Sequence, residues 1–147
     1  MKPVKDIMRN LPSSCEKYDS IETVASRMSL SSLEFLPVVN ERSEVIGTIT
    51  YDAVQQVMSA NKSYKENLRV VDVMKTQTHM VNTNDDEAAA LKIMRNNHAS
   101  YLPVVDDENH LRGVVSFMTL ARRIIRLKQQ LKKDGKQMRL KGIGISI

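Results

Sequence analysis

Two hydroxyl residues, Thr50 and Ser116, stand 66 positions apart, each three residues after a glycine in the runs "GTIT" and "GVVS". Each lies where a predicted strand leads into a predicted helix. The free N–H groups at a helix start and the helix dipole favour an anion at such a place. These positions therefore predict phosphate contacts, although a hydroxyl here also serves as an ordinary helix N-cap.

The residues around these hydroxyls would suit a cleft for a flat ligand. Pro37 and Pro103 lack a backbone N–H, which leaves neighbouring backbone groups free to meet a ligand. Gly47 and Gly113 lie inside strand patterns, where a missing side chain allows close backbone approach. Met8 and Met74 occupy equivalent places in the sequence, and such methionines can also simply fill a core. Apolar residues that could line such a cleft are Ile7, Met8, Leu36, Val73, Met74 and Leu102.

The spacing of 66 extends over most of the chain. Residues 4–58 align with residues 70–124 without a gap, and ten of these 55 positions are identical. Four identities are contiguous in "FLPVV" and "YLPVV". The sequence therefore predicts two copies of one unit, with repeat one over 1–60, a polar linker over 61–69, repeat two over 70–126 and a basic extension over 127–147.

Each repeat contains the same predicted elements. Apolar residues at helical spacing follow Asp19 and Asp85, which are the expected N-caps. Two short apolar runs joined by a polar turn, 35–50 and 101–116, predict a pair of strands, and a second helix follows each pair. Each repeat opens with an extended lead-in, which carries Met8 in repeat one and Met74 in repeat two. The last helix is expected to reach about Lys133, on an apolar stripe of Leu120, Ile124, Leu127 and Leu131.

A tandem β-α-β-β-α unit with "LPVV", an acidic turn and then Gly-apolar-apolar-Thr/Ser resembles the cystathionine β-synthase (CBS) domain pair, or Bateman module. The resemblance covers Val4 to about Arg126. It implies an α/β (α+β) fold of two repeats packed around a pseudo-twofold axis, with two clefts between them. Members of that family bind AMP, ADP, ATP or S-adenosylmethionine in the clefts and report its level to an effector protein. The resemblance implies no required cofactor.

One departure from the family pattern concerns the ribose. Nucleotide-binding repeats usually carry an Asp three residues after the Thr/Ser, where its two oxygens grip the ribose hydroxyls. Ala53 and Thr119 occupy these positions and cannot replace the carboxylate. Asp52 and Thr119 remain the nearest polar candidates, although Asp52 is one residue early and points about 100° away on a helix. Either the ribose is held differently, or binding is weak, or the clefts are empty.

Asn97 and His98 lie in the predicted helix-to-strand loop of repeat two, where related proteins place residues that reach phosphates. Repeat one has Ser31 and Ser32 there. A single loop histidine is ordinarily only solvent-exposed. The asymmetry nevertheless favours a phosphate contact from the second repeat.

The composition disfavours several other classes of function. The sequence has no nucleophile elbow and no Walker loop, and Cys15 has no evident base partner, so we expect no enzyme. His79 and His110 lack Cys, Asp or Glu at metal-ligand spacing, so no metal site is expected. A single cysteine, a start without a secretory apolar region and no apolar run of about 20 residues predict a cytoplasmic protein without a membrane segment.

Charge is concentrated at the end of the chain. Nine of the 22 Lys/Arg residues and one of the 17 acids lie from Arg122 onward, a net charge of +8 there against −3 elsewhere. The apolar stripe of the last helix needs a partner, and the resemblance to CBS modules implies a homodimer that buries it. Alternating apolar residues in "QMRLKGIGISI" predict a short strand that could add to a sheet edge, or a frayed end. A ligand-free dimerisation scaffold is the alternative function. Nucleic-acid binding through the basic tail ranks lower, because few aromatic residues are available for stacking.

Overall fold

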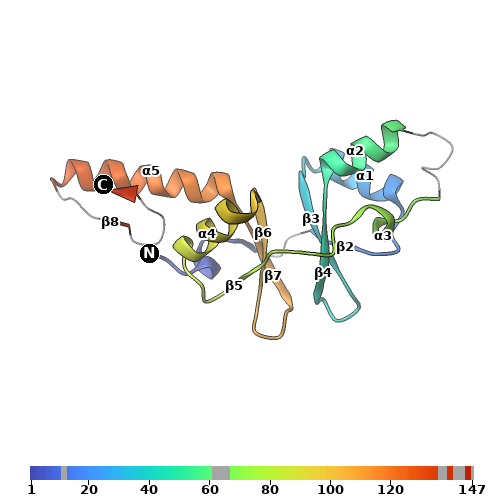
Figure 1. Cartoon of the computed structure of the whole chain (residues 1–147), viewed down its shortest axis with the longest axis horizontal. Helices are drawn as coiled ribbons and strands as arrows, with labels where there is room; N and C mark the ends of the chain where they lie inside the picture. Colours follow the sequence, from blue (N-terminus) through green and yellow to red (C-terminus); the bar gives the residue numbers. More distant parts are fainter. Residues whose placement is uncertain (11–12, 61–66, 136–138, 141–144, 147) are drawn as a thin grey trace. The chain divides into compact units, whose positions relative to one another are not determined.

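The computed structural model describes residues 1–10, 13–60, 67–135, 139–140 and 145–146. The chain forms two compact units (Figure 1). Unit 1 comprises Met1–Leu11, His79–Asp107 and Arg112–Ile147, and unit 2 comprises Pro12–Thr78 and Glu108–Leu111. Neither unit is one uninterrupted repeat, because the first residues of the chain join most of repeat two.

Unit 2 is a three-stranded sheet with its helices. Strand β2 is parallel to β3, which is antiparallel to β4, so the sheet order is β2-β3-β4. The register places Phe35 opposite Thr50 and shifts between Val38 and Val39. Helix α1 packs against α2. The elements are β2 Cys15–Glu16, α1 Ile21–Leu30, β3 Phe35–Val39, β4 Val45–Thr50, α2 Tyr51–Ala60 and α3 Val70–Val73.

Unit 1 repeats this plan and adds one strand, giving the sheet order β1-β7-β6-β5. Strand β1 is antiparallel to β7, and β5 is parallel to β6. Helix α4 packs against α5, the long helix in Figure 1. The elements are the 3-10 helix η1 Val4–Asp6, β1 Arg9–Asn10, β5 Val81–Asn82, α4 Glu87–Asn97, β6 Tyr101–Val105, β7 Leu111–Ser116 and α5 Phe117–Lys133. The mixed α+β class and the end of the last helix at Lys133 are confirmed.

The expected N-caps are wrong by one residue. Ser20 caps α1 by accepting from the Thr23 N–H at 3.1 Å, and Asp86 caps α4 by accepting from the Ala89 N–H at 2.9 Å. Asp19 and Asp85 instead close the preceding turns, where each carboxylate accepts a backbone N–H three residues earlier. Asp suits both places because its short carboxylate reaches nearby N–H groups.

The lead-ins are crossed: each docks on the helix start of the other repeat. The Ile21 N–H donates to the Leu68 carbonyl at 3.0 Å, and the Val70 N–H donates to the Asp19 carbonyl at 3.0 Å. The equivalent residues of the other lead-in and helix make the same two bonds. The Glu87 N–H donates to the Lys2 carbonyl, and the Val4 N–H donates to the Asp85 carbonyl. Each lead-in opens with one helical turn, α3 or η1, rather than the fully extended segment expected from the sequence.

The turn Glu108–Leu111 belongs to unit 2, where it meets the turn between β3 and β4. The Val45 N–H donates to the Asn109 carbonyl at 3.2 Å, and the Leu111 N–H donates to the Ser43 carbonyl at 2.9 Å. Ser43 and Asn109 both have positive φ, 61° and 65°. Since they are equivalent residues of the two repeats, the two turns make this contact symmetrically.

Each unit has its own apolar core. The core of unit 2 takes residues from β2, α1, β3, β4, α2 and α3, and that of unit 1 from η1, β5, α4, β6, β7 and α5. From the predicted α5 stripe, Leu120 and Ile124 are buried in the unit 1 core, so this part needs no second copy. Three other apolar residues of α5 are exposed: Phe117, Met118 and Ile125.

The basic tail forms a small ladder of its own. Arg139–Leu140 (β8) pairs antiparallel with Ile145–Ser146 (β9). The expected strand is therefore present, but it pairs within the tail rather than with the edge of another sheet. Residues 137–138, 141–144 and 147, over which the same prediction extends, lie outside the described residues.

Candidate functional site

The predicted phosphate contact of unit 1 lies at the junction of β7 and α5. Ser116 is the N-cap of α5, and its Oγ accepts from the Thr119 N–H at 3.2 Å. The Ser116 and Thr119 hydroxyls are also hydrogen-bonded to each other, at 2.9 Å. The Ser116 hydroxyl therefore caps the helix and donates to Thr119, while the Thr119 hydroxyl keeps its own proton, so an anion here would meet the helix dipole and at most this one hydroxyl donor.

The equivalent junction of unit 2 has the same design. Thr50 Oγ1 accepts from the Ala53 N–H at 3.2 Å. Asp52 is exposed in the first turn of α2 and accepts from the Gln56 side-chain amide at 3.2 Å. Asp52 therefore stabilises the start of α2, where its negative charge complements the helix dipole.

The two strand glycines face the lead-ins. A Cβ on Gly47 would lie 2.6 Å from the Lys75 carbonyl oxygen and 3.2 Å from Met74 Sδ. Lys75 also exchanges two backbone hydrogen bonds with Thr48, at 2.9 and 3.0 Å. The close backbone approach predicted for this glycine is thus made by the chain itself.

The apolar candidates separate into two groups by burial. Leu36 and Leu102 are 0% exposed and belong to the cores, so their side chains offer no surface to a purine. The half-buried members all come from the lead-ins: Ile7, Met8, Val73 and Met74. Pro37 and Pro103 are buried inside β3 and β6. A ligand that packs against these candidates would therefore meet the lead-ins.

Asn97 and His98 end helix α4. The Asn97 side-chain amide donates to the Ile93 carbonyl at 2.8 Å, and His98 has φ 52° at the C-cap, with its N–H bonded to the Met94 carbonyl. The His98 side chain is exposed. The loop after His98 contacts the β7–α5 junction: the Phe117 N–H at the start of α5 donates to the Ser100 carbonyl at 2.8 Å. His98 therefore lies two residues from the junction that carries Ser116.

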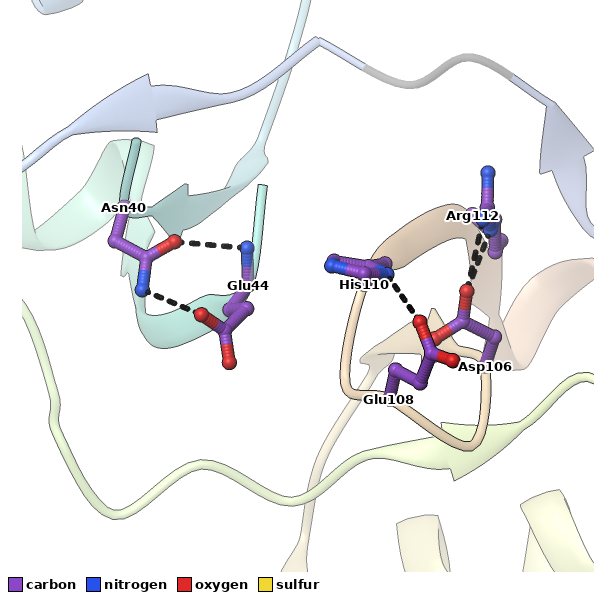
Figure 2. Close-up of polar contacts among 6 residues, drawn as sticks. All are labelled: Asn40, Glu44, Asp106, Glu108, His110 and Arg112. Carbon is purple, nitrogen blue, oxygen red and sulfur yellow. Dashed lines mark hydrogen bonds and ion pairs between the residues drawn. The ribbon is translucent and has the colours of Figure 1, made fainter. Parts of the chain in front are cut away.

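A pocket that the sequence did not predict lies at the ends of β2 and β3 in unit 2. Its volume is about 340 Å³. One side is the turn in which the Asn40 side chain bonds to the Glu44 backbone N–H and carboxylate, at 3.0 and 3.2 Å (Figure 2). The lining is mostly charged: Glu16, Lys17, Tyr18, Val39, Asn40, Glu41, Arg42 and Glu44. It lies at the opposite end of β3 from Thr50.

Figure 2 also shows two side-chain contacts close to the turn of the second hairpin, one from a histidine and one from an arginine. His110 Nδ1 lies 3.5 Å from Glu108 Oε2, and Arg112 Nη2 lies 2.8 Å from Asp106 Oδ2. Within the described ranges, no group of three or more His, Cys, Asp and Glu residues could hold a metal ion. No helix of the described part is both long and apolar enough to cross a membrane.

No sequence pattern indicates the most buried charge in the described part of the chain. Glu87 is 1% exposed, and its two carboxylate oxygens accept from Arg123 Nε and Nη2 at 2.9 and 2.8 Å. Burial by itself would raise the pKa of Glu87. The hydrogen bonds from Arg123 and from the Lys2 N–H, together with the Arg123 charge, outweigh that effect and hold the pKa below its usual value.

Curated relatives match this chain over most of its length but over a small part of their own. An inosine-5'-monophosphate dehydrogenase of Methanocaldococcus jannaschii is 29% identical over 82% of this chain and 22% of its own length. A homoserine O-acetyltransferase of Methanococcoides burtonii is 31% identical over 76% of this chain and 22% of its own length. The chain thus spans about a fifth of each relative.

Solved structures share the fold. A CBS domain-containing protein of Bacillus anthracis has a TM-score of 0.78 at 16% identity, covering 86% of this chain and 94% of that one. CBSX2 of Arabidopsis thaliana, solved with AMP, has a TM-score of 0.73 at 19% identity, covering 87% and 99%. The CBS domain pair of MJ0100, solved with 5'-methylthioadenosine and S-adenosyl-L-methionine, has a TM-score of 0.75 at 22% identity, covering 86% and 98%.

The model of the CBS domain family matches the chain twice, over residues 4–60 and 70–126. The two matched segments stand in the 66-residue register of the internal repeat. Together they span most of the 147 residues. The chain therefore belongs to the CBS domain family, with two copies of the domain in tandem.

Proposed function

We propose that this protein is a regulatory module that binds an adenosine-containing ligand, such as AMP, ADP, ATP or S-adenosylmethionine, and signals to a partner protein. One observation carries the proposal: the same constellation of residues occurs in each unit. A half-buried lead-in methionine packs on a strand glycine, and a capped helix starts three residues later. In unit 1 these are Met8, Gly113 and Ser116, and in unit 2 Met74, Gly47 and Thr50.

The chemistry of this constellation suits a nucleoside. The lead-in side chains Ile7, Met8, Val73 and Met74 offer partly exposed apolar surface for a purine, while the helix starts offer a positive dipole for a phosphate or carboxylate. The ribose lacks a carboxylate partner, since Ala53 and Thr119 occupy the positions three residues after Thr50 and Ser116. We expect modest affinity, because a charged two-point contact is missing.

Thermal unfolding against a ligand panel tests this proposal. AMP, ADP, ATP, S-adenosylmethionine and 5'-methylthioadenosine are each added at millimolar concentration. A ligand at 100 times its Kd should stabilise the fold by about 2.7 kcal/mol, which raises Tm by a few degrees. If no compound raises Tm, adenosine sensing by this chain is refuted.

Alanine variants locate the ligand in one unit or the other. Met8→Ala should reduce the ligand-induced shift that arises in unit 1, and Met74→Ala the shift in unit 2. Met118→Ala is the matched control, because Met118 is 57% exposed on α5 and lies outside the constellation. Equal ligand shifts in all three variants would show that the ligand binds elsewhere.

The second candidate is a dimerisation scaffold without a ligand. The exposed apolar face of α5, with Phe117 at 46%, Met118 at 57% and Ile125 at 53% exposure, favours it. Such a face on a helix is expected to be covered by another surface. The partner in this proposal is a second copy of the chain. Self-association without any ligand-induced shift in Tm would favour the scaffold.

A further inference from the structure

Glu87 connects three segments of unit 1. It is the first residue of α4, and its carboxylate bonds Arg123 of α5 at two points. Its Oε1 also accepts from the Lys2 N–H of the lead-in at 3.0 Å. Glu87 is the one buried charged residue in the described part of the chain. The carboxylate therefore depends on α5 and the lead-in for its hydrogen bonds.

The equivalent residue of the other repeat is apolar. Ile21, 66 positions earlier, is 0% exposed, and Val57 stands at the position equivalent to Arg123. The other buried core positions are apolar in both repeats, as the equivalent pairs show: Val4/Val70, Cys15/Val81, Val24/Ala90, Ala25/Leu91, Met28/Met94, Leu36/Leu102, Val38/Val104, Ile49/Val115 and Val54/Leu120. Glu87 is thus the one buried position at which the two cores differ in charge.

The backbone does not distinguish the two repeats at this place. The Glu87 N–H donates to the Lys2 carbonyl at 3.2 Å, as the Ile21 N–H donates to the Leu68 carbonyl at 3.0 Å. Helix α5 packs on α4 as α2 packs on α1. An α2 helix could therefore dock on α4, and α5 on α1, with the same backbone geometry and matching apolar residues. Such an exchange, within one chain or between copies, is a domain swap.

We propose that the Glu87–Arg123 pair is a pairing device that selects α5 as the partner of α4 and prevents exchange of the homologous segments of the two repeats. The selection works against both wrong pairings. With α2 on α4, Val57 would leave the Glu87 carboxylate buried without a cation. With α5 on α1, Arg123 would face the apolar Ile21. Specificity here arises because each wrong helix pairing leaves a charged side chain without its ion-pair partner.

The test gives the second repeat the residues of the first, in the variant Glu87→Ile with Arg123→Val. Replacing a buried ion pair by apolar residues is often neutral or stabilising, so the variant should fold with a Tm close to that of the wild type. In this variant, α4 should no longer pair only with α5. After refolding from denaturant, size-exclusion chromatography with light scattering should show several slowly exchanging species, whereas the wild type gives one.

Selective ¹⁵N labelling of glycine provides a local readout of the same exchange. Gly47 and Gly113 each pack on one lead-in, so their amide signals report which lead-in is present. The wild type should give one signal for each, and the double variant should give additional signals. Asp106→Asn with Arg112→Gln removes an ion pair whose arginine side chain is 55% exposed, and it should keep the single set.

Three results would overturn the proposal. A double variant that refolds to one species with one signal per glycine shows that pairing does not depend on the ion pair. A double variant that fails to fold shows that the pair is needed for stability rather than for selection. Single variants, Glu87→Ile or Arg123→Val, that are as stable as the double variant show that the two residues are not coupled.

Discussion

The sulfur atom of Met8 lies in the space that a side chain on Gly113 would need. A Cβ on Gly113 would come within 2.5 Å of Met8 Sδ and 2.8 Å of the Arg9 carbonyl oxygen. The register of β1 and β7, with Arg9 opposite Val114, fixes that carbonyl in place. Glycine is therefore required here because the lead-in lies directly on the strand.

Gly113→Ala is expected to destabilise the fold by about 1–3 kcal/mol, the usual cost of overpacking. The Met8 side chain can move, but the Arg9 carbonyl cannot move without breaking the β1–β7 pairing. Urea unfolding measures the loss, and adding Met8→Ala should restore only part of it. Full stability of Gly113→Ala would mean that the lead-in is not held on β7 in solution.

The Glu87 carboxylate should make stability depend on acid pH. Its pKa in the folded state lies below 4.5, so its contribution is complete above that pH and is lost as the pH falls through the folded-state value. Glu87→Gln should cost about 2 kcal/mol at pH 7. This difference from the wild type should shrink below pH 4.5 in denaturant titrations. A gap that stays constant from pH 7 to pH 3 would contradict the ionised pair.

Cys15 should be unreactive in the folded protein. Burial, aided by the negative charge of Asp19, raises the pKa of its thiol to about 12, although Arg27 acts in the opposite direction. At pH 8 a thiol reagent should therefore label Cys15 only as fast as unfolding exposes it. Ser13→Cys in a Cys15→Ser background is the exposed control and should react at once. Equally fast labelling of both proteins would disprove the burial of Cys15.

The proposed dimerisation through α5 predicts that Ile125→Glu weakens self-association. Ile125 is 53% exposed on α5. A charge there would be buried against a second copy of the chain but would not enter the unit 1 core. Sedimentation at micromolar concentration should shift toward the monomer. Gln129→Glu adds the same charge one turn along and is expected to have a smaller effect. An unchanged association state in Ile125→Glu would place any dimer contact elsewhere.

Truncation after Gln129 gives a second test of the α5 face. The removed segment contains Leu131, which is half-buried, but none of the exposed apolar residues Phe117, Met118 and Ile125. The sequence alone predicts that this truncation weakens the dimer. From the structure we expect a smaller shift in sedimentation than for Ile125→Glu, and the reverse order would make the end of the helix the contact.

Local patterns in the sequence determined most of the elements. Hydrophobic periodicity identified the helices and the strand pairs, and the 66-residue register linked them into two repeats. The N-caps were predicted one residue early, because Asp19 and Ser20, like Asp85 and Asp86, can both accept N–H groups at a chain turn. Two neighbouring acceptors therefore compete for the N–H groups at one turn. The small differences in hydrogen-bond geometry that decide between them cannot be read from the residue types.

Contacts between distant residues were decided only by the tertiary structure. Nothing in the sequence indicates that each lead-in docks on the other repeat, because both lead-ins carry the same pattern. Glu87 resembles an ordinary first-turn acid until Arg123, 36 residues later, is brought beside it. Likewise, Leu120 is buried while Ile125 is exposed because the α4 side of α5 is covered. The sequence specifies which residues are apolar or charged, and the packing of distant segments decides which of them meet.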